Sequence, residues 1–276
     1  MSAALVFAVF AVALITATTF YLFFYRTWRR ERELRTPFPE PWRRQLDANV
    51  PLYRQLPEAL KQTLEQRVQL FLSEKEFYGC DGFEVDDMVR VTIAGHACLL
   101  ILARPYSDFD EVSSILVYPD AYHVRDIESD GLVVSESSEI RAGEASSRGQ
   151  VVLAWKECEE AASNPHSGHN VILHEFAHQL DYLDGTADGA PPLSGEQARH
   201  WQTSMTHAYE HLRHSLHHHQ KPWLDPYGAT EPAEFFAVLT EAFFQQPNHL
   251  KHEQPEVYKA LQGYYRLDPT TFWRDA

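Results

Sequence analysis

The sequence predicts an α+β domain with a mostly helical C-terminal half, preceded by one N-terminal transmembrane helix. Three observations lead to this fold class. Residues 2–25 are uncharged and largely apolar, short strand-like apolar runs occupy the first half of the remaining chain, and amphipathic helical stretches fill the second half. Because strands come first and helices follow, the order favours an α+β domain over a series of βαβ units.

Residues 1–25 contain the candidate membrane anchor. The 24 residues from Ser2 to Tyr25 carry no charge. At about 1.5 Å per residue they form roughly 36 Å of helix, and a hydrocarbon core is about 30 Å thick. A cleavable signal peptide is the alternative, but it normally begins with basic residues, which MSAALV lacks. We therefore expect contact with the membrane through residues 2–25.

The flank of this anchor predicts its orientation. The segment RTWRRERELR contains five arginines and two glutamates, and basic flanks tend to stay in the cytoplasm. Cys80, Cys98 and Cys158 include no CxxC pair, which fits a reducing compartment better than a disulfide framework. We expect a single-pass protein of the inner (cytoplasmic) membrane whose catalytic domain, from Arg26 onward, is cytoplasmic.

The rest of the chain divides into a tether and one domain. Residues 26–50 are rich in arginine and proline and are expected to be a tether, so the domain spans residues 51–276. The stretch 120–149 is expected to be a loop with one short strand at 131–135. The stretch 86–102 is expected to be a buried helix, and its valines and isoleucine leave a strand as the alternative. The other expected elements are strands at 113–119 and 150–155 and helices at 58–74, 168–183, 194–219, 231–245 and 254–265.

The charge of the chain argues against one class of partner. The formal net charge is −15, whereas binding to phosphate backbones requires a basic face. We therefore expect no direct binding to nucleic acid.

The stretch NVILHEFAHQLDYLDG contains the strongest functional signal. On a helix, His174 and His178 lie one turn apart on the same face and can offer imidazole nitrogens to one ion. Glu175 follows the first histidine and can reach the water that such an ion activates, which is the arrangement of a zinc peptidase. The alternative is a core helix whose two histidines form hydrogen bonds with their neighbours.

A zinc peptidase needs a third protein ligand, and DPYGATEPAEFFAVLTEAFF offers candidates. Glu234 and Glu241 are seven residues apart and share one face of an amphipathic helix, whereas Glu231 falls in its exposed first turn. A carboxylate on a buried helix needs a partner. Glu234 is the expected third ligand, and Glu241 is expected to support the site from behind the ligands or to be structural.

Asp181 lies three residues after His178 on the same side of the helix. It is expected to accept the second N–H of a ligand imidazole, since metal-binding histidines usually have such a partner. The alternative is an aspartate at the end of the helix, before the turn at Asp184–Gly185.

The motif HEFAHQLDYLDG followed by DPYGATEPAEFFAVLTEAFF resembles the Mlc titration factor A family of zinc peptidases. The segments GFEV, ILVYPDAYHV and VVLAW resemble it as well, so the likeness covers approximately residues 50–270. It implies a zincin-like fold with His174, His178 and Glu234 as zinc ligands and Glu175 as general base. It also implies that the phenol of Tyr227 lies near the zinc, and that substrate lies along an edge strand, for which SSILVYP is the candidate.

These observations together predict an enzyme. We expect a zinc peptidase with one Zn²⁺ per chain that hydrolyses a peptide or protein substrate. The family resemblance implies that its action is aminopeptidase-like and regulatory. The alternative is a regulatory protein that binds and sequesters a transcriptional repressor, with hydrolysis secondary. A zinc-stabilised structural domain is disfavoured, because three ligands leave the open position that is typical of catalysis.

A second group of histidines recurs at helical spacing within His207–His219. The sequence leaves open whether this tract binds a second metal or forms a solvated, weakly basic helix face; its members at that spacing are His207, His211, His214 and His218.

Overall fold

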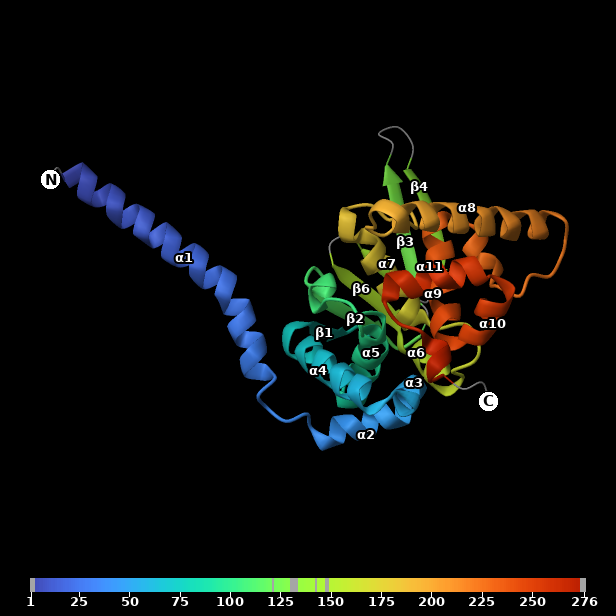
Figure 1. Cartoon of the computed structure of the whole chain (residues 1–276), viewed down its shortest axis with the longest axis horizontal. Coiled ribbons are helices and arrows are strands. Elements are labelled where there is room, and N and C mark those ends of the chain that lie inside the picture. The colour runs from blue at the N-terminus through green and yellow to red at the C-terminus, as the bar shows by residue number, and fades with distance from the viewer. Residues whose placement is uncertain (1–2, 121, 130–133, 142, 147–148, 274–276) are drawn as a thin grey trace.

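The computed structural model describes residues 3–120, 122–129, 134–141, 143–146 and 149–273. A long N-terminal helix extends away from a body in which helices surround a small sheet (Figure 1). The chain is therefore a mixed α and β protein that is mostly helical, as the sequence predicted.

The N-terminal helix α1 (Ala3–Glu33) has 31 residues. Its apolar part has a mean hydropathy of 2.3, and none of that part is buried against the rest of the protein. Phe7, Phe10 and Leu14 are each at least 70% exposed, although a soluble surface rarely exposes large apolar side chains in a row. By length and composition, α1 can cross a membrane.

Residues 26–50 differ from the tether that their composition predicted. Helix α1 continues to Glu33, and α2 (Glu40–Asn49) and α3 (Pro51–Gln55) follow. Leu46 and Val50 are fully buried. They lie so close to Gly95 that a Cβ there would be 2.7 Å from each side chain. Arginine and proline suggested a solvated segment, but two apolar residues four apart give α2 a buried stripe, so packing begins before residue 51.

The sheet has the strand order β1-β2-β6-β5, formed by β1 (Glu76–Gly79), β2 (Ser114–Tyr118), β6 (Gln150–Ala154) and β5 (Gly143–Ser146). The first three strands are parallel, and β5 is antiparallel to β6. Parallel neighbours need a crossover, and α5 (Asp87–Leu100) provides it between β1 and β2. The parallel strands β1 and β2 with α5 between them form one βαβ unit, although the domain is not a series of such units.

The position of β2 also corrects the expected substrate strand. The segment SSILVYP contains β2, which is paired on both sides, with β1 and with β6. A strand with two partners has no free backbone edge for a peptide. The edge strands of this sheet are β1 and β5.

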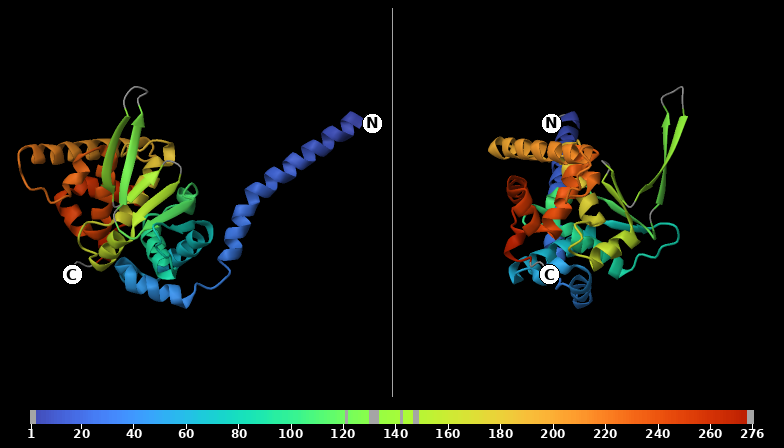
Figure 2. Two further views of the ribbon diagram at one scale, coloured as in Figure 1. Left: turned by 180° about the vertical axis from the view of Figure 1, so that it is seen from behind. Right: turned by 90° about the vertical axis from the view of Figure 1, so that its right-hand side faces the viewer.

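The stretch 120–149 is not the loop that its polar composition predicted. Strands β3 (Tyr122–Ser129) and β4 (Val134–Arg141) form an antiparallel hairpin that projects from the body (Figure 2). Of the expected strand at 131–135, residues 131–133 lie outside the described residues, and the other two begin β4. Hydrogen bonds between the two backbones hold such a hairpin together. Its strands therefore do not need the alternating apolar pattern by which strands are predicted from sequence.

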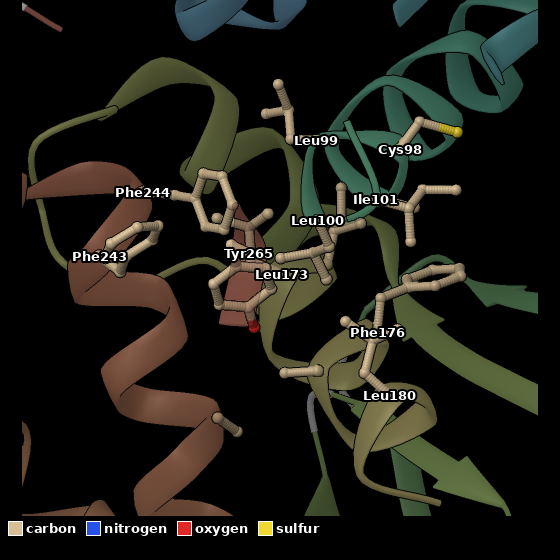
Figure 3. Close-up of a cluster of buried hydrophobic side chains, with 14 of the residues drawn as sticks. Cys98, Leu99, Leu100, Ile101, Leu173, Phe176, Leu180, Phe243, Phe244 and Tyr265 are labelled. Atoms are coloured by element: carbon tan, nitrogen blue, oxygen red, sulfur yellow. The ribbon is translucent and has the colours of Figure 1, made fainter. Parts of the chain in front are cut away.

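Helix α7 (Val171–Asp181) occupies the centre of the body, and each of its residues is buried. Leu173, Phe176 and Leu180 lie among side chains of α5 and α9 (Figure 3). The helix is thus held rigidly from several sides. The other helices are α4 (Glu58–Glu74), α6 (Trp155–Ser163), α8 (Gly195–His217), α9 (Pro232–Gln245), α10 (Pro247–Glu253) and α11 (Pro255–Tyr265), with short 3-10 turns η1 (Tyr106–Phe109), η2 (Tyr182–Asp184), η3 (Pro226–Ala229) and η4 (Pro269–Thr271).

Two glycines allow a prediction about the junction of β2 and β6. Gly149 has φ +72°, and a Cβ there would lie 1.8 Å from the carbonyl oxygen of Glu111. Gly82 has φ +79° but no heavy atom within 4 Å of such a Cβ. Gly82→Ala should lower the free energy of unfolding by about 1 kcal/mol, because an alanine there must adopt the left-handed backbone conformation and meets no other obstacle. Gly149→Ala should lower it by about 3 kcal/mol, because backbone must also move. Thermal melts of both variants test this, and equal losses would contradict it.

Candidate metal centre

The helix that carries HEFAH begins at a well-formed cap. The side-chain oxygen of Asn170 accepts hydrogen bonds from the backbone N–H groups of Ile172 and Leu173, each at 3.1 Å. Such a cap satisfies donors that the first turn leaves unpaired. The helix ends at Asp181, and Gly185 (φ +98°) closes the following turn at the expected place. His174 and His178 are therefore fixed one turn apart on a helix that is defined at both ends.

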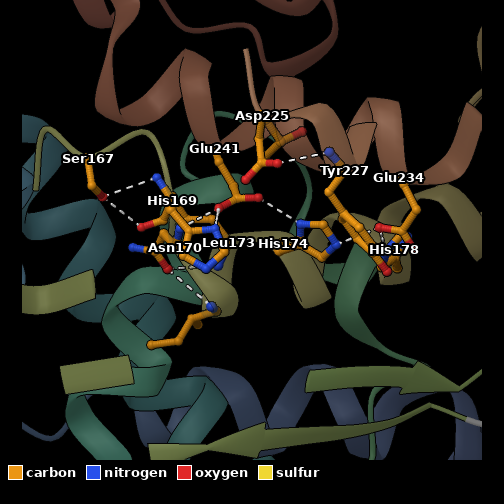
Figure 4. A network of polar contacts seen from close by, with 12 residues as sticks. Ser167, His169, Asn170, Leu173, His174, His178, Asp225, Tyr227, Glu234 and Glu241 are labelled. Atoms are coloured by element: carbon orange, nitrogen blue, oxygen red, sulfur yellow. Dashed lines mark hydrogen bonds and ion pairs between the residues drawn. The ribbon is translucent and has the colours of Figure 1, made fainter. Parts of the chain in front are cut away.

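Helix α9 brings the two expected glutamates against α7. Its first turn contains Pro232, whose missing N–H costs nothing at that position. Glu234 is in this turn and is partly buried, and Glu241 lies two turns further and is 1% exposed. Both carboxylates point toward His174 (Figure 4).

His174, His178 and Glu234 form a group suited to a metal ion. One donor atom from each lies within 4.8 Å of the others. The Nε2 of His174 is 2.8 Å, and the Nε2 of His178 is 3.5 Å, from one oxygen of Glu234. Ligands bound tetrahedrally at about 2.0–2.1 Å from zinc are about 3.3 Å apart. Two imidazoles and one carboxylate at these separations fit such an ion and leave a fourth position for water or substrate.

His174 lies between two carboxylates. Its Nε2 faces Glu234, and its Nδ1 is 2.7 Å from Glu241. Burial by itself lowers the pKa of His174, but the hydrogen bonds to these two carboxylates outweigh it and hold the pKa well above its usual value. Burial by itself raises the pKa of Glu234, but hydrogen bonds from His174 and His178 outweigh it and lower that pKa. A metal cation at Nε2 therefore competes with a proton, since a ligand imidazole must be neutral.

Glu175 is on the same helix but outside the group of three. It is 6% exposed. Burial raises its pKa to about 7, and the nearby imidazoles oppose this shift. A carboxylate with a pKa near neutrality can both accept and release a proton at physiological pH.

Tyr227 stands at the open side of the site, on the turn η3. Its backbone N–H donates to Asp225 at 2.8 Å, which fixes the turn (Figure 4). The ring centroid is 6.0 Å from that of His174, and the side chain is 52% exposed. Burial and the charges of Glu234 and Glu175 raise its pKa to about 12. The phenol therefore keeps its proton and is a hydrogen-bond donor at the rim of the site.

Asp181 has a different partner from the one expected. Its Oδ2 accepts from the backbone N–H of Gly189 at 2.8 Å, and it is fully buried. Because Asp181 is the last residue of α7, its carboxylate reaches the loop that follows the helix. It is thus the helix-terminal aspartate of the alternative interpretation, and its contact closes that loop.

Two residues that the sequence did not point to support the site. The side-chain amide of Asn170 donates to Nδ1 of His96 at 3.1 Å, and Nε2 of His96 lies 3.1 Å from the carbonyl oxygen of Asn49 in α2. The backbone N–H of Asn170 donates to Glu241. A chain of hydrogen bonds thus runs from α2 through His96 and Asn170 to the carboxylate behind His174. An asparagine directly before an apolar helix is a readable cap signal, but no sequence signal indicated His96.

His96 allows a prediction about pH. It is 4% exposed, and burial lowers its pKa from 6.5 to about 4. The unfolded chain therefore binds a proton that the folded protein does not, so this residue lowers stability progressively from about pH 6.5 to about pH 4, by about 3 kcal/mol in all. Between pH 7 and pH 5, the melting temperature of His96→Gln should therefore fall less than that of the wild type. The exposed His252→Gln variant is the control, and parallel pH profiles for wild type and His96→Gln would contradict the prediction.

The histidine tract on α8 does not form a second group of this kind. Among the described residues, His174, His178 and Glu234 are the one set of three donors that converge. The histidines of the tract are all exposed: His207, His211, His214, His217, His218 and His219. The solvated-face interpretation therefore describes the tract in this structure.

Comparison with known proteins identifies relatives over most of the chain. Residues 25–266 match the model of a family described as glucose-regulated metallo-peptidase M90. An uncharacterized protein of Synechocystis sp. is 42% identical over 245 residues, which cover 88% of this chain and 89% of that protein. The Mlc titration factor A of Cronobacter sakazakii is 30% identical over 84% of this chain and 87% of its own length. The protein of the same name from Yersinia pestis is 29% identical over 80% and 83% of the two chains.

Proposed function

Because the chain belongs to the family of glucose-regulated metallo-peptidases M90, we propose that it is a zinc-dependent peptidase. Family membership implies a metal. The observation that supports zinc and hydrolysis is the convergence of His174, His178 and Glu234 within 4.8 Å, with Glu175 on the buried helix of the two histidines. Two histidines and one carboxylate are a ligand set of zinc peptidases. We propose one Zn²⁺ per chain and keep a zincin-like fold as part of the proposal.

Each residue of the site has a separate role in the proposed hydrolysis. Zinc, when bound, supplies a Lewis acid that activates water and polarises the scissile carbonyl. Glu175 takes the proton of the attacking water and returns it to the leaving amine, a task that suits a carboxylate with a pKa of about 7. Tyr227 donates a hydrogen bond from its phenolic O–H to the oxyanion that develops during attack. Glu241 holds the imidazole of His174 with Nε2 directed toward Glu234.

Two further parts of the proposal concern the mode of cleavage and the cellular location of the protein. We propose aminopeptidase-like trimming, which the family resemblance implies, and a regulatory purpose, which fits the description of the family as glucose-regulated. Helix α1 supports a single-pass anchor in the inner membrane, and the arginines after it support a cytoplasmic domain.

Turnover by the full-length protein tests the proposal. The purified protein is stripped with a chelator, reloaded with one equivalent of zinc and incubated with a mixed peptide library. Products read by mass spectrometry should appear only in the reloaded sample. Removal of single residues from the N-termini would support aminopeptidase action, whereas internal cuts would support endopeptidase action. A zinc-loaded protein that leaves the library intact would overturn the peptidase proposal.

A repressor-binding role is the second candidate. It is favoured by the name Mlc titration factor A of two relatives, which implies an interaction with the Mlc repressor. In that case the zinc site stabilises a binding surface, and hydrolysis is secondary. If Glu175→Gln abolishes peptide cleavage but leaves the effect on a repressor unchanged, binding is the primary function.

A further inference from the structure

The helix that forms the anchor is joined rigidly to the domain. Helix α1 continues without a break from its apolar part to Glu33. Tyr21, Tyr25 and Trp28 are exposed on it, and tyrosine and tryptophan gather where a spanning helix leaves the hydrocarbon. At about 1.5 Å per residue, Arg30 lies only about 3 Å further along the axis than Trp28. The domain contacts made by Arg30 therefore lie at the level of the lipid headgroups.

Arg30 binds two carboxylates of the domain. Its guanidinium is 2.8 Å and 2.9 Å from the two oxygens of Glu74, at the end of α4, and 2.5 Å from Asp110, just after η1. It also lies 4.7 Å from the centre of the Tyr106 ring. The side chains of Arg30, Glu74 and Asp110 are each less than a quarter exposed. Planar, bidentate pairing shielded from water holds its geometry far better than an exposed ion pair.

Neutral hydrogen bonds hold the same junction. Gln69 of α4 is 4% exposed and donates to the carbonyl oxygens of Glu33 and Thr36, at 2.9 Å and 3.0 Å. Arg29 donates to the carbonyl oxygen of Ser73 at 2.6 Å. We refer to the contacts of Arg29, Arg30 and Gln69 with the domain as the arginine clamp. It fastens both the last turns of α1 and the residues that follow it.

The arginine clamp is close to the metal centre. The 3-10 turn η1 carries Tyr106 at one end and Phe109 at the other. The ring of Phe109 is 5.3 Å from that of Phe176, which directly follows Glu175 in α7. Both phenylalanines are fully buried. Two layers of packed side chains thus separate the headgroup level from the metal-binding helix, and packed cores do not deform freely.

We propose that the arginine clamp sets the height and orientation of the metal centre over the bilayer, so that the substrates are polypeptide segments attached to the same membrane. This inference rests on the proposed peptidase function and on α1 as the anchor. Two molecules held by one membrane meet at a high effective concentration, which favours such substrates over free peptides. A rigid joint adds selectivity, because only bonds at a matching distance from the bilayer reach the metal centre.

The test measures the rate of cleavage as a function of the distance between the cleavable sequence and the membrane. Full-length protein is inserted into vesicles of phosphatidylcholine and phosphatidylglycerol together with a substrate carrying one cleavable sequence behind a spanning helix. Flexible spacers of about 5 to about 60 residues vary the reach, which grows as about 5–6 Å times the square root of their number. The same sequence as a free peptide is the reference. We expect wild type to cleave best at one intermediate spacer, about 10-fold faster than at the shortest and longest.

Two substitutions remove different contacts of the arginine clamp. Gln69→Leu removes the hydrogen bonds to the end of α1 and leaves every charge in place. Arg30→Gln removes the charge between Glu74 and Asp110. Both should flatten the spacer profile while cleaving the free peptide within about twofold of wild type. The matched control is Arg32→Gln, because Arg32 contacts Trp28 of the same helix and lies outside the clamp, so it should keep the wild-type profile.

A distance measurement tests the joint without relying on activity. Spin labels at positions 31 and 58, both exposed glutamates on α1 and α4, report the distance between anchor and domain in a Cys80→Ser background. Wild type in vesicles should give a narrow distance distribution, and Gln69→Leu and Arg30→Gln should give broader ones. A broad distribution in wild type would overturn the rigid joint.

The outcomes separate this inference from the proposed function. Cleavage of the free peptide combined with a flat spacer profile in wild type would overturn the inference and leave the peptidase intact. Failure to cleave the free peptide in any form of the protein would overturn the proposed function, and the inference with it.

Discussion

Glu175→Gln is expected to lower kcat/KM for peptide hydrolysis by about 10²- to 10⁴-fold while the protein keeps its zinc. The amide has nearly the same shape as the carboxylate but cannot accept the proton of the attacking water. The atoms that can hold a metal ion belong to His174, His178 and Glu234, so metal content should stay at one equivalent. The measurement combines initial rates on a peptide found in the library with metal analysis of the same sample.

The control for this substitution is Glu159→Gln, which makes the same chemical change on the exposed face of α6. It should leave rate and metal content unchanged. Undiminished turnover in Glu175→Gln would remove Glu175 from the role of base. Loss of zinc together with activity would show that Glu175 supports the ligands instead.

Glu241→Leu should weaken zinc binding by about 10- to 100-fold. The substitution removes the acceptor that lies 2.7 Å from Nδ1 of His174, so the ring loses both its orientation and the carboxylate that raises its basicity. Glu241→Gln should have a smaller effect, because an amide oxygen can still accept a hydrogen bond from Nδ1. A titration against a chromophoric chelator gives the zinc affinity of each variant.

The main competing explanation is a general loss of stability, since Glu241 is 1% exposed and also accepts from the backbone of Asn170. Thr240→Val provides the comparison. It removes a buried hydrogen bond between Thr240 and Tyr265 at 2.7 Å, one residue away on α9, without touching a ligand. If Thr240→Val weakens zinc binding as much as Glu241→Leu does, the specific role of Glu241 is wrong.

Much of the helical structure and the convergence of the ligands followed from local patterns. The expected helix at 58–74 coincides with α4, because Leu64, Val68 and Phe71 form an unambiguous apolar face. Spacings of four and seven residues likewise identified which histidines and glutamates share a face. Once α7 and α9 pack side by side, His174, His178 and Glu234 meet. The roles assigned to these residues remain predictions.

The features that the sequence did not reveal depend on contacts between distant segments. Asp181 was expected to serve a histidine, but the loop after α7 brings Gly189 to it instead. His96 touches Asn49 and Asn170, which are 47 and 74 positions away, and local periodicity carries no information about such pairs. The composition of residues 26–50 predicts a tether, whereas the spacing of Leu46 and Val50 gives α2 its buried face.

The short link between α1 and α2 is the place where the N-terminal helix can be separated from the folded body. Residues 34–37 are exposed, and α2 begins at Glu40. A cut in this link would release a body that still contains α2, with the carbonyl oxygen of Asn49 in place for His96. A cut at residue 50, where composition placed the boundary, would instead strip Leu46 from the core and leave His96 without that acceptor. The covalent junction between α1 and the body therefore lies at residues 34–39, and release of the body by a cut there also requires the contacts of the arginine clamp to open.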